Sequence, residues 1–370
     1  MKIELNATRI GPRPSGAKQR FVGIYTELFA RLPNDEFVIY EPADCRTEDW
    51  FPRSSNVRYC KTPILSESRV QKFFADLSFL HSRKEAHNCN IFEWFNFPAF
   101  RMAADRSIIT IHDVRRLVFN NNVIAKNISK YIVDFSLDAV DEVVTVSEAV
   151  RDEILHLYPK TRVSVIYNGI DLGIYESITA DDCEAVRQKL NIPSEFILAV
   201  GHLEKRKNYA NLIDALALLH SSGKAIPLLI VGNDSGERSS IAKRIHRLGL
   251  SRYVMLLCGL SDIEIRCLYK LCALFVYPSA YEGFGIPILE AMAAKRPMVL
   301  SNIPVFREIT QDVGCYFRHE FPESIAGEIF NGLSSTSLRE TLINYGNKRV
   351  HDFGFENIAL AYERLYKDSA

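Results

Sequence analysis

The chain has no surplus of charge of either sign, because 45 Lys and Arg residues balance 45 Asp and Glu residues. Nucleic-acid-binding domains usually carry a basic surplus, so the balance gives that class of function no support. No apolar run is long enough to span a bilayer. Residues 1–6 read directly as a strand, without a charged and then apolar leader. We therefore expect a cytoplasmic protein rather than a secreted one.

Metal-binding and redox motifs are also missing. The eight cysteines are scattered without a Cys-x-x-Cys pair, which favours reduced and mostly buried thiols. His81, His87 and Cys89 lie close together in the sequence, but their spacing fits no standard zinc site. No Gly-x-Gly-x-x-Gly follows a predicted strand, so dinucleotide-dependent oxidoreduction is a weak hypothesis.

What the chain does contain is enough apolar residues for two cores. Its 370 residues exceed the size at which one core usually keeps growing. Short apolar, β-branched runs alternate with amphipathic helical stretches, which indicates parallel sheets covered on both faces. The predicted strands are 37–40, 107–111, 142–146 and 163–166 in the first half, and 196–200, 227–231, 254–257, 274–277 and 297–300 in the second. The pattern predicts two doubly wound α/β domains, with a cleft where the carboxyl ends of both sets of strands open.

The most informative stretch is Tyr281–Glu290, a glycine-containing turn that runs from a predicted strand into a helix. Glu282 and Glu290 lie eight residues apart near its two ends. Glu290 lies about one helical turn beyond the helix start and leans back towards it, where a carboxylate can accept hydrogen bonds from both hydroxyls of a ribose. Glu282, on the loop, is free to meet another part of the same ligand. This geometry suits a nucleotide-sugar.

The turn itself has the composition of an anion site. Gly283 and Gly285 let the backbone bend sharply and approach a ligand closely. The amides of Phe284, Gly285 and Ile286 lie near the predicted helix start, where free donors and the helix dipole favour a diphosphate. For the two carboxylates alone, an ordinary turn with two surface glutamates would be the better explanation.

A basic loop follows the strand that ends at Gly201. Asn208 is placed to cap the next helix, which holds Arg206 and Lys207 at the ligand-binding edge of the sheet. A cation there can counter the charge that builds as a diphosphate departs. A solvated basic turn is the ordinary alternative; we rank it below phosphate binding for Lys207 and level with it for Arg206.

In the first half, His112 and Asp113 close an apolar strand. Polar residues at the carboxyl end of such a strand face the crevice, so we predict that His112 belongs to the site. Asp113 is suited either to orient this histidine or to bind an acceptor, and the sequence does not separate these roles. The loop 10–17 contains Gly11 and Gly16, which is a weak signal by itself because its spacing is no nucleotide fingerprint.

Taken in order along residues 1–365, these motifs resemble the family 4 retaining glycosyltransferases, and Tyr281–Glu290 resembles their Glu-x7-Glu signature. The resemblance implies a GT-B fold of two Rossmann-like domains. It makes residues 1–170 an acceptor-binding domain and residues 171–349 a nucleotide-sugar-binding domain. The last helix, from about residue 350 to residue 370, is expected to return to the first domain.

The resemblance also implies roles for single residues. His112 would lie beside the donor sugar, Glu282 would hold sugar hydroxyls, and Lys207 would contact phosphate. Gly16, in the loop that enters the first helix, would lie near the sugar and phosphates. Many relatives carry an arginine where this chain has His202, and Arg206 is the candidate to replace it.

The implied reaction transfers a hexose, with mannose slightly preferred, from a nucleoside diphosphate sugar to a glycan or a lipid-linked acceptor in bacterial surface polysaccharide or glycolipid synthesis. No Asp-x-Asp follows a strand, so this mechanism requires no metal or other cofactor. The helical stretch Ser68–Lys84 mixes phenylalanines with basic residues. It would suit either transient contact with the inner face of a membrane or, more commonly, core packing.

Other functions remain compatible with the same architecture. They are a nucleotide-sugar epimerase, a phosphorylase, and a non-catalytic scaffold that keeps the fold. Only a transferase releases nucleoside diphosphate in proportion to the acceptor glycosylated. The sequence leaves the donor base, the acceptor and the oligomeric state open.

Overall fold

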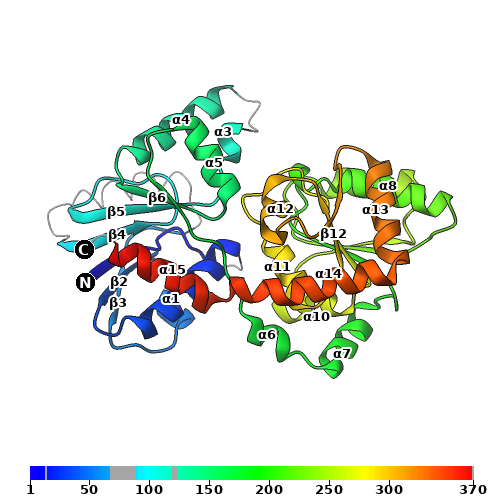
Figure 1. Ribbon diagram of the computed structural model, residues 1–370, viewed down its shortest axis with the longest axis horizontal. Helices are drawn as coiled ribbons and strands as arrows, with labels where there is room; N and C mark the ends of the chain where they lie inside the picture. The colour runs from blue at the N-terminus through cyan, green and yellow to red at the C-terminus, as the bar shows by residue number, and fades with distance from the viewer. Residues whose placement is uncertain (13–14, 67–87, 119–122, 369–370) are drawn as a thin grey trace. The chain divides into compact units, whose positions relative to one another are not determined.

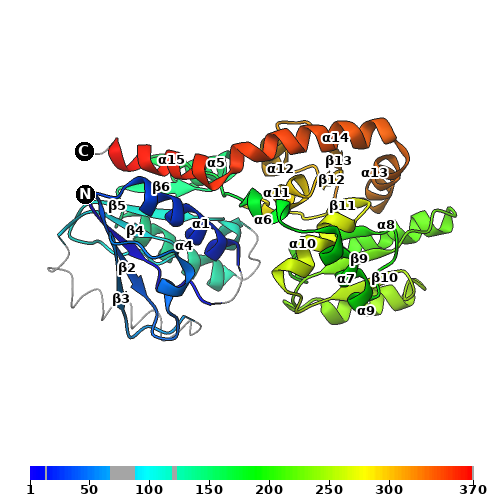
Figure 2. The same ribbon diagram turned by 90° about the horizontal axis from the view of Figure 1, so that it is seen from below.

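The computed structural model describes residues 1–12, 15–66, 88–118 and 123–368 of the chain. The chain divides into two compact units, Met1–Gly169 with Phe355–Ala370, and Ile170–Gly354. Figures 1 and 2 show the elements of each unit. The predicted helix Ser68–Lys84, with His81, and the nearby His87 lie outside the described residues.

The first unit is built on a parallel sheet with the strand order β3-β2-β1-β4-β5-β6-β7. Its strands are β1 (Lys2–Asn6), β2 (Glu36–Glu41), β3 (Val57–Lys61), β4 (Cys89–Trp94), β5 (Ala104–Ile111), β6 (Glu142–Thr145) and β7 (Val163–Val165). Its helices are α1 (Gly16–Arg31), η1 (Thr47–Trp50), α3 (Arg115–Val118), α4 (Val123–Leu137), α5 (Glu148–Leu157) and α15 (Phe355–Lys367). Ser147 caps α5 by accepting a hydrogen bond from the backbone N–H of Val150 at 3.1 Å.

The second unit is built on a parallel sheet with the order β10-β9-β8-β11-β12-β13. Its strands are β8 (Ile197–Val200), β9 (Leu228–Val231), β10 (Val254–Leu257), β11 (Leu274–Tyr277), β12 (Met298–Ser301) and β13 (Cys315–Phe317). Its helices are α6 (Leu172–Glu176), α7 (Ala180–Leu190), η2 (Lys205–Lys207), α8 (Tyr209–Ser221), α9 (Arg238–Arg247), α10 (Asp262–Leu271), α11 (Ile286–Ala293), α12 (Pro304–Thr310), α13 (Pro322–Ser334), α14 (Thr336–Arg349) and η3 (Val350–Phe353). Both units are therefore doubly wound, as the alternating pattern predicts.

Three strands escaped the sequence analysis. In β3 and β4 polar residues such as Arg58 and Glu93 interrupt the apolar run, and β13 has only three residues. Each is short or broken in pattern, so periodicity alone does not separate it from a loop.

The last helix, α15, packs against α1 in the first unit, and Figure 1 shows the two helices side by side. Buried Glu93 of β4 ties this layer to the sheet. Its carboxylate accepts hydrogen bonds from the hydroxyls of Tyr25 at 2.6 Å, Tyr366 at 2.7 Å and Tyr362 at 3.2 Å. Burial raises the pKa of Glu93, so the three hydroxyls compensate a carboxylate that is costly to bury.

The start of α15 depends on glycine elsewhere in the first unit. The ring of Phe355 lies against Gly23 of α1 and against Gly169, and a Cβ at either glycine would overlap that ring. Glycine is needed at these positions because of the close approach of the ring, since neither has a positive φ.

We predict that Gly23→Ala destabilises the protein by about 1–3 kcal/mol, because the added methyl must displace Phe355. Gly327→Ala is the matched control. Gly327 also lies in a helix, but a Cβ there meets nothing within 4 Å. The control should gain about 0.5–1 kcal/mol from helix propensity. Urea unfolding measures both, and equal effects of the two substitutions would contradict the packing account.

Candidate functional site

The turn after β11 is fixed by a glycine that no other residue can replace without strain. Gly285 has a φ of 148°, and a Cβ there would lie 3.2 Å from side-chain atoms of Ile288 and Phe306. Gly285 is the N-cap of α11, and a proline stands in the first turn of that helix. Gly283, Phe284 and Gly285 are buried, and Ile286 begins the helix at the carboxyl edge of the second sheet.

Glu282, at the start of this turn, lies between two cations. Its Oε1 is 2.7 Å from Nζ of Lys207, and its Oε2 is 2.5 Å from Nη1 of Arg206. The hydroxyl of Ser279 donates a hydrogen bond to Oε1 at 2.7 Å. We call Arg206, Lys207 and Glu282 the ion cluster. The cluster brings the basic loop and the turn together, although Arg206 and Tyr281 are 75 residues apart in the chain.

The charges of the ion cluster depend on one another. Burial alone would raise the pKa of Glu282, but Lys207 and Arg206 outweigh it and lower this pKa to about 2. Burial lowers the pKa of Lys207, and the opposing attraction of Glu282 limits the fall. The side chains of Lys207 and Glu282 are only 7% and 10% exposed, so neither charge is well solvated and each needs the other.

The basic loop is shaped to bring its lysine inward. Gly201 follows β8 with a φ of 147°, and a Cβ there would lie 2.9 Å from Cε of Lys207. Lys207 also donates a hydrogen bond to the hydroxyl of Tyr277 at 2.9 Å. Asn208 is the N-cap residue of α8, as predicted, but its side chain makes no capping hydrogen bond. Asn208 adopts a left-handed conformation at the N-cap, and its amide donates instead to the carbonyl of His319 at 2.6 Å.

Arg206 is directed by two further groups. Its Nη2 lies 2.7 Å from a carboxylate oxygen of Glu204, and its Nη1 donates to the carbonyl of Tyr281 at 3.0 Å. These contacts hold the guanidinium beside the turn. Arg206 therefore belongs to the ion cluster, and the alternative explanation of a solvated basic turn does not apply to it.

Glu290 lies on α11 and has different partners. Its carboxylate accepts a hydrogen bond from the hydroxyl of Tyr269 at 2.8 Å, and Tyr175 is a second hydrogen-bond partner. Burial raises the pKa of Glu290, against the lowering effect of these hydroxyls. Two tyrosyl hydroxyls thus compensate the buried Glu290 carboxylate.

In the first unit, His112 follows β5 and lines a cavity of about 450 Å³. Burial, and then the charge of Arg20, lowers the pKa of His112 to about 3, although part of the residue remains exposed in the cavity. The imidazole is therefore neutral at physiological pH. The cavity also has polar and apolar walls, formed by Arg9, Asn96, Asp113 and Arg115, and by Phe97, Leu117, Ile132 and Val133.

The structure also places Asp113 and Gly16, the other two residues of the first unit that the sequence singled out. Oδ1 of Asp113 lies 3.6 Å from Nε of Arg115. The same oxygen accepts a hydrogen bond from the backbone N–H of Arg115 at 3.2 Å. Gly16 is the exposed first residue of α1, after the N-cap Ser15.

Sequence reasoning missed several residues of the second unit. Tyr277 stands at the carboxyl end of β11, so its polar group at a strand end was an available signal. Tyr175 and Tyr269 come from α6 and α10, and nothing local in the sequence marks them as partners of Glu290. Glu204 could have been noticed only by pairing it with Arg206 across the loop.

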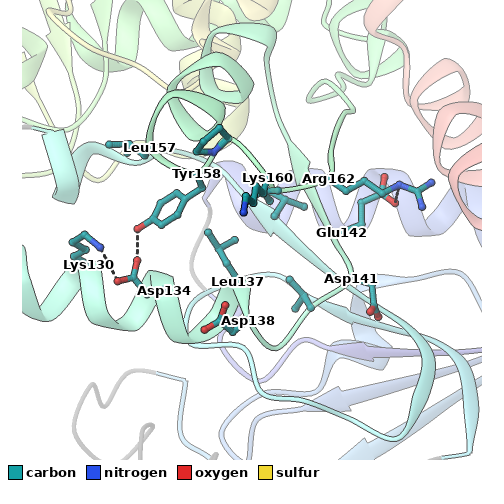
Figure 3. Close-up of a pocket in the computed structure, with 14 residues that line it drawn as sticks. Lys130, Asp134, Leu137, Asp138, Asp141, Glu142, Leu157, Tyr158, Lys160 and Arg162 are labelled. Atoms are coloured by element: carbon teal, nitrogen blue, oxygen red, sulfur yellow. Dashed lines mark hydrogen bonds and ion pairs between the residues drawn. The ribbon is translucent and has the colours of Figure 1, made fainter.

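A larger cavity of about 750 Å³ lies at the amino ends of β6 and β7 (Figure 3). Its charged groups largely satisfy one another, because Lys130 pairs with Asp134 at 2.7 Å and Arg162 with Glu142 at 3.1 Å. The cavity is at the amino edge of the sheet, whereas His112 lies at the carboxyl edge, after the end of β5. It is therefore a weaker candidate than the carboxyl edge.

Within residues 1–12, 15–66, 88–118 and 123–368, no cluster of three or more His, Cys, Asp or Glu side chains has the arrangement of a metal site. Over the same residues, no helix is both long enough and apolar enough to cross a bilayer.

The ion cluster predicts a pH dependence of stability. Because the folded-state pKa of Glu282 lies near 2, below its ordinary 4.5, its contribution is present above about pH 4.5 and is lost as the pH falls towards 2. Over that range the wild type should lose roughly 3 kcal/mol more unfolding free energy than Glu282→Gln.

Chemical denaturation at several pH values measures this difference. Asp312→Asn is the control, since Asp312 is a 70% exposed partner of Arg307, and its effect should stay below about 1 kcal/mol. Parallel pH profiles for the wild type and Glu282→Gln would show that the carboxylate is not held by the two cations.

Comparison with known proteins bears on both units. Residues 26–173 match the family described as Glycosyltransferase Family 4, and residues 182–349 match Glycosyl transferases group 1. Over 299 residues the chain is 28% identical to O-antigen chain mannosyltransferase B of Escherichia coli, covering 78% of each chain. It is 31% identical over 252 residues to O-antigen chain mannosyltransferase RfbU of Salmonella typhimurium, covering 68% of this chain and 66% of that one.

Solved structures share the architecture. HepE of Anabaena, in complex with UDP and glucose, aligns with a TM-score of 0.76 at 18% identity over 100% of both chains. WaaG, a glycosyltransferase involved in lipopolysaccharide biosynthesis, aligns with a TM-score of 0.76 at 17% identity, covering 98% of this chain and 99% of that one. At this identity the likeness establishes the fold, which is GT-B with two Rossmann-like sheets. Together with the matches to both family descriptions, it shows that the chain belongs to the family 4 glycosyltransferases.

Proposed function

We propose that this glycosyltransferase moves a hexose, with mannose preferred, from a nucleoside diphosphate sugar to an acceptor hydroxyl, with retention of anomeric configuration, in the synthesis of a bacterial surface polysaccharide or glycolipid. The observation that carries the proposal is the ion cluster beside the glycine turn of α11. The mannosyltransferase relatives support mannose and a polysaccharide.

In this proposal the second unit binds the donor. Lys207 and Arg206 are partly neutralised by Glu282 in the unliganded protein, so a diphosphate would enter as a competing anion. The amides of Gly283, Phe284, Gly285 and Ile286 add donors at the start of α11.

Glu290 and Glu282 have separate roles. Glu290 would exchange its tyrosyl partners for ribose hydroxyls, which offer the same kind of hydrogen bond. When the diphosphate draws Lys207 and Arg206 away, Glu282 would become free to accept hydrogen bonds from hydroxyls of the sugar.

The first unit would supply the acceptor site, in the cavity beside His112. A neutral imidazole can orient a sugar hydroxyl by a hydrogen bond without adding a positive charge that would compete for the diphosphate. Gly16, at the start of α1, would leave space for the sugar and phosphates. We assign no covalent nucleophile, and the departing phosphate would take up the acceptor proton.

Transfer in this proposal needs no metal, because Lys207 and Arg206 already supply two positive charges where the diphosphate leaves. A nucleoside diphosphate leaving group is stabilised by two such cations much as it would be by a divalent ion.

A screen of UDP-, GDP- and dTDP-sugars tests the proposal. We expect saturable binding of one donor, GDP-mannose first, and release of nucleoside diphosphate in proportion to glycosylated acceptor, unchanged by EDTA. Conversion of the sugar without any acceptor would indicate an epimerase instead. Failure of every donor to bind would contradict the proposed function. Loss of transfer in EDTA would contradict the claim that transfer needs no metal.

A further inference from the structure

Tyr277 ends β11 at the carboxyl edge of the second sheet, and its side chain contacts Lys207 in two ways. Its hydroxyl accepts a hydrogen bond from Nζ of Lys207 at 2.9 Å. The same ammonium lies 4.9 Å from the centre of the Tyr277 ring, within the range of a cation–π contact. Besides the carboxylate of Glu282, Lys207 thus has a neutral partner that comes from the sheet itself.

The ring of Tyr277 is held in place by the core of the second unit. The residue is 1% exposed, and its ring stacks on Phe306 of α12 with 4.8 Å between the ring centres and 20° between the planes. Phe306 also lies against Gly285, where a Cβ would come within 3.2 Å of its ring. The stack thus connects Lys207 with the glycine turn of α11. Because protein cores are close-packed, a ring enclosed in this way keeps its hydroxyl at one position.

The two partners of Lys207 differ in charge. Glu282 is negative, so it competes with a diphosphate for the ammonium. Burial, and then the charge of Glu282, raises the pKa of Tyr277 well above its ordinary value, so the hydroxyl is uncharged at physiological pH. An uncharged acceptor does not repel a phosphate group. Since an ammonium has three N–H donors, Lys207 can keep its bond to Tyr277 while it turns the others towards phosphate oxygens.

We propose that Tyr277 is a positioning residue for sugar transfer, because its hydroxyl keeps the Lys207 ammonium in the donor site when the ammonium leaves Glu282 for the diphosphate. This role rests on the proposed function, in which Lys207 contacts the diphosphate. A lysine ends a flexible four-carbon chain, so a fixed acceptor beside its ammonium reduces the freedom that is lost on binding phosphate. Tyr277 acts through Lys207, since a residue that is 1% exposed has almost no surface of its own for the donor.

The hydroxyl also favours the charged form of Lys207. Burial lowers the pKa of Lys207, and the charge of Glu282 opposes the fall. Arg206 lowers this pKa as well, whereas Glu204 raises it. A hydrogen-bond acceptor stabilises an ammonium more than a neutral amine, so loss of the Tyr277 hydroxyl should lower the pKa of Lys207 further. The titratable groups around the ammonium are Glu204, Arg206, Tyr209, Tyr277 and Glu282.

The pH dependence of nucleoside diphosphate binding tests the role of Tyr277. Titration calorimetry of the full chain uses whichever of UDP, GDP and dTDP the wild type binds most tightly. It runs from about pH 6 to about pH 10, the range over which a buried lysine loses its proton. The variant is Tyr277→Phe, which keeps the ring and its stack on Phe306.

Near neutral pH, Tyr277→Phe should bind the nucleotide about threefold more weakly than the wild type, because Lys207 is less well placed. Its binding should also begin to weaken about half a pH unit or more below the wild type, because Lys207 loses its proton earlier. Both proteins bind the same nucleotide, so ionisation of the base cancels in the comparison.

Two further variants separate the positioning of Lys207 from a general effect on the fold. In Lys207→Met the ammonium is absent, so adding Tyr277→Phe should cause no further loss of affinity and no further shift of the pH profile. Tyr209→Phe is the matched control, because Tyr209 is also buried, at 2% exposed, and its hydroxyl donates to the carbonyl of Gly201 at 2.9 Å. It should lose stability to a similar extent in urea unfolding, and it should keep the affinity and the pH profile of the wild type.

Three results would overturn the positioning role. One is a Tyr277→Phe variant with the affinity and the pH profile of the wild type. Another is an equal shift of the profile in Tyr209→Phe, or a further loss on adding Tyr277→Phe to Lys207→Met, since the effect would then not act through the ammonium. The third is a wild type that binds none of UDP, GDP and dTDP. Only this last result would also overturn the proposed function, so the two failures are distinct.

Discussion

The attraction between Glu282 and the two cations Lys207 and Arg206 is the interaction on which the candidate donor site depends. Two positive side chains cannot lie next to each other, largely out of water, unless a negative group compensates them. Glu282 supplies that group, and the surrounding residues make room for it. Gly201 lacks the Cβ that would crowd Lys207, and the turn through Gly285 places the carboxylate beside the basic loop.

This arrangement connects stability with function. In the unliganded protein the ion cluster and Glu204 together carry no net formal charge, because Glu282 and Glu204 offset the two cations. A diphosphate can take the place of Glu282 at the cations, because it carries more negative charge than one carboxylate. The carboxylate that is released then lies beside the ligand. A residue that stabilises the empty site thereby becomes available to hold the sugar, which is why we assign Glu282 to the sugar and Glu290 to the ribose.

Features of the fold and the site were predictable from the sequence where they depend on neighbouring residues in the chain, and not where they depend on distant ones. Parallel strands such as β10 and β11 were predicted to the residue because they are continuous apolar runs. β4 was missed because Glu93, which breaks its pattern, is compensated by tyrosines from α1 and α15 that are distant in the chain. The turn at Gly285 and the placement of Arg206 and Lys207 were predictable from glycine and strand-end rules. The tyrosines around Glu290 and the reversal of the Asn208 side chain were not, since both depend on tertiary partners.

The binding of a nucleoside diphosphate to variants of the ion cluster tests the central claim most directly. Titration calorimetry would compare the wild type with Lys207→Met and Glu282→Gln, using the nucleotide of the preferred donor. The account predicts that Lys207→Met weakens binding by roughly tenfold or more, because a charge-assisted hydrogen bond to phosphate is lost. It predicts that Glu282→Gln binds at least as tightly as the wild type, because the cations no longer have a competing carboxylate. Unchanged affinity in Lys207→Met, or an equal loss in both variants, would contradict it.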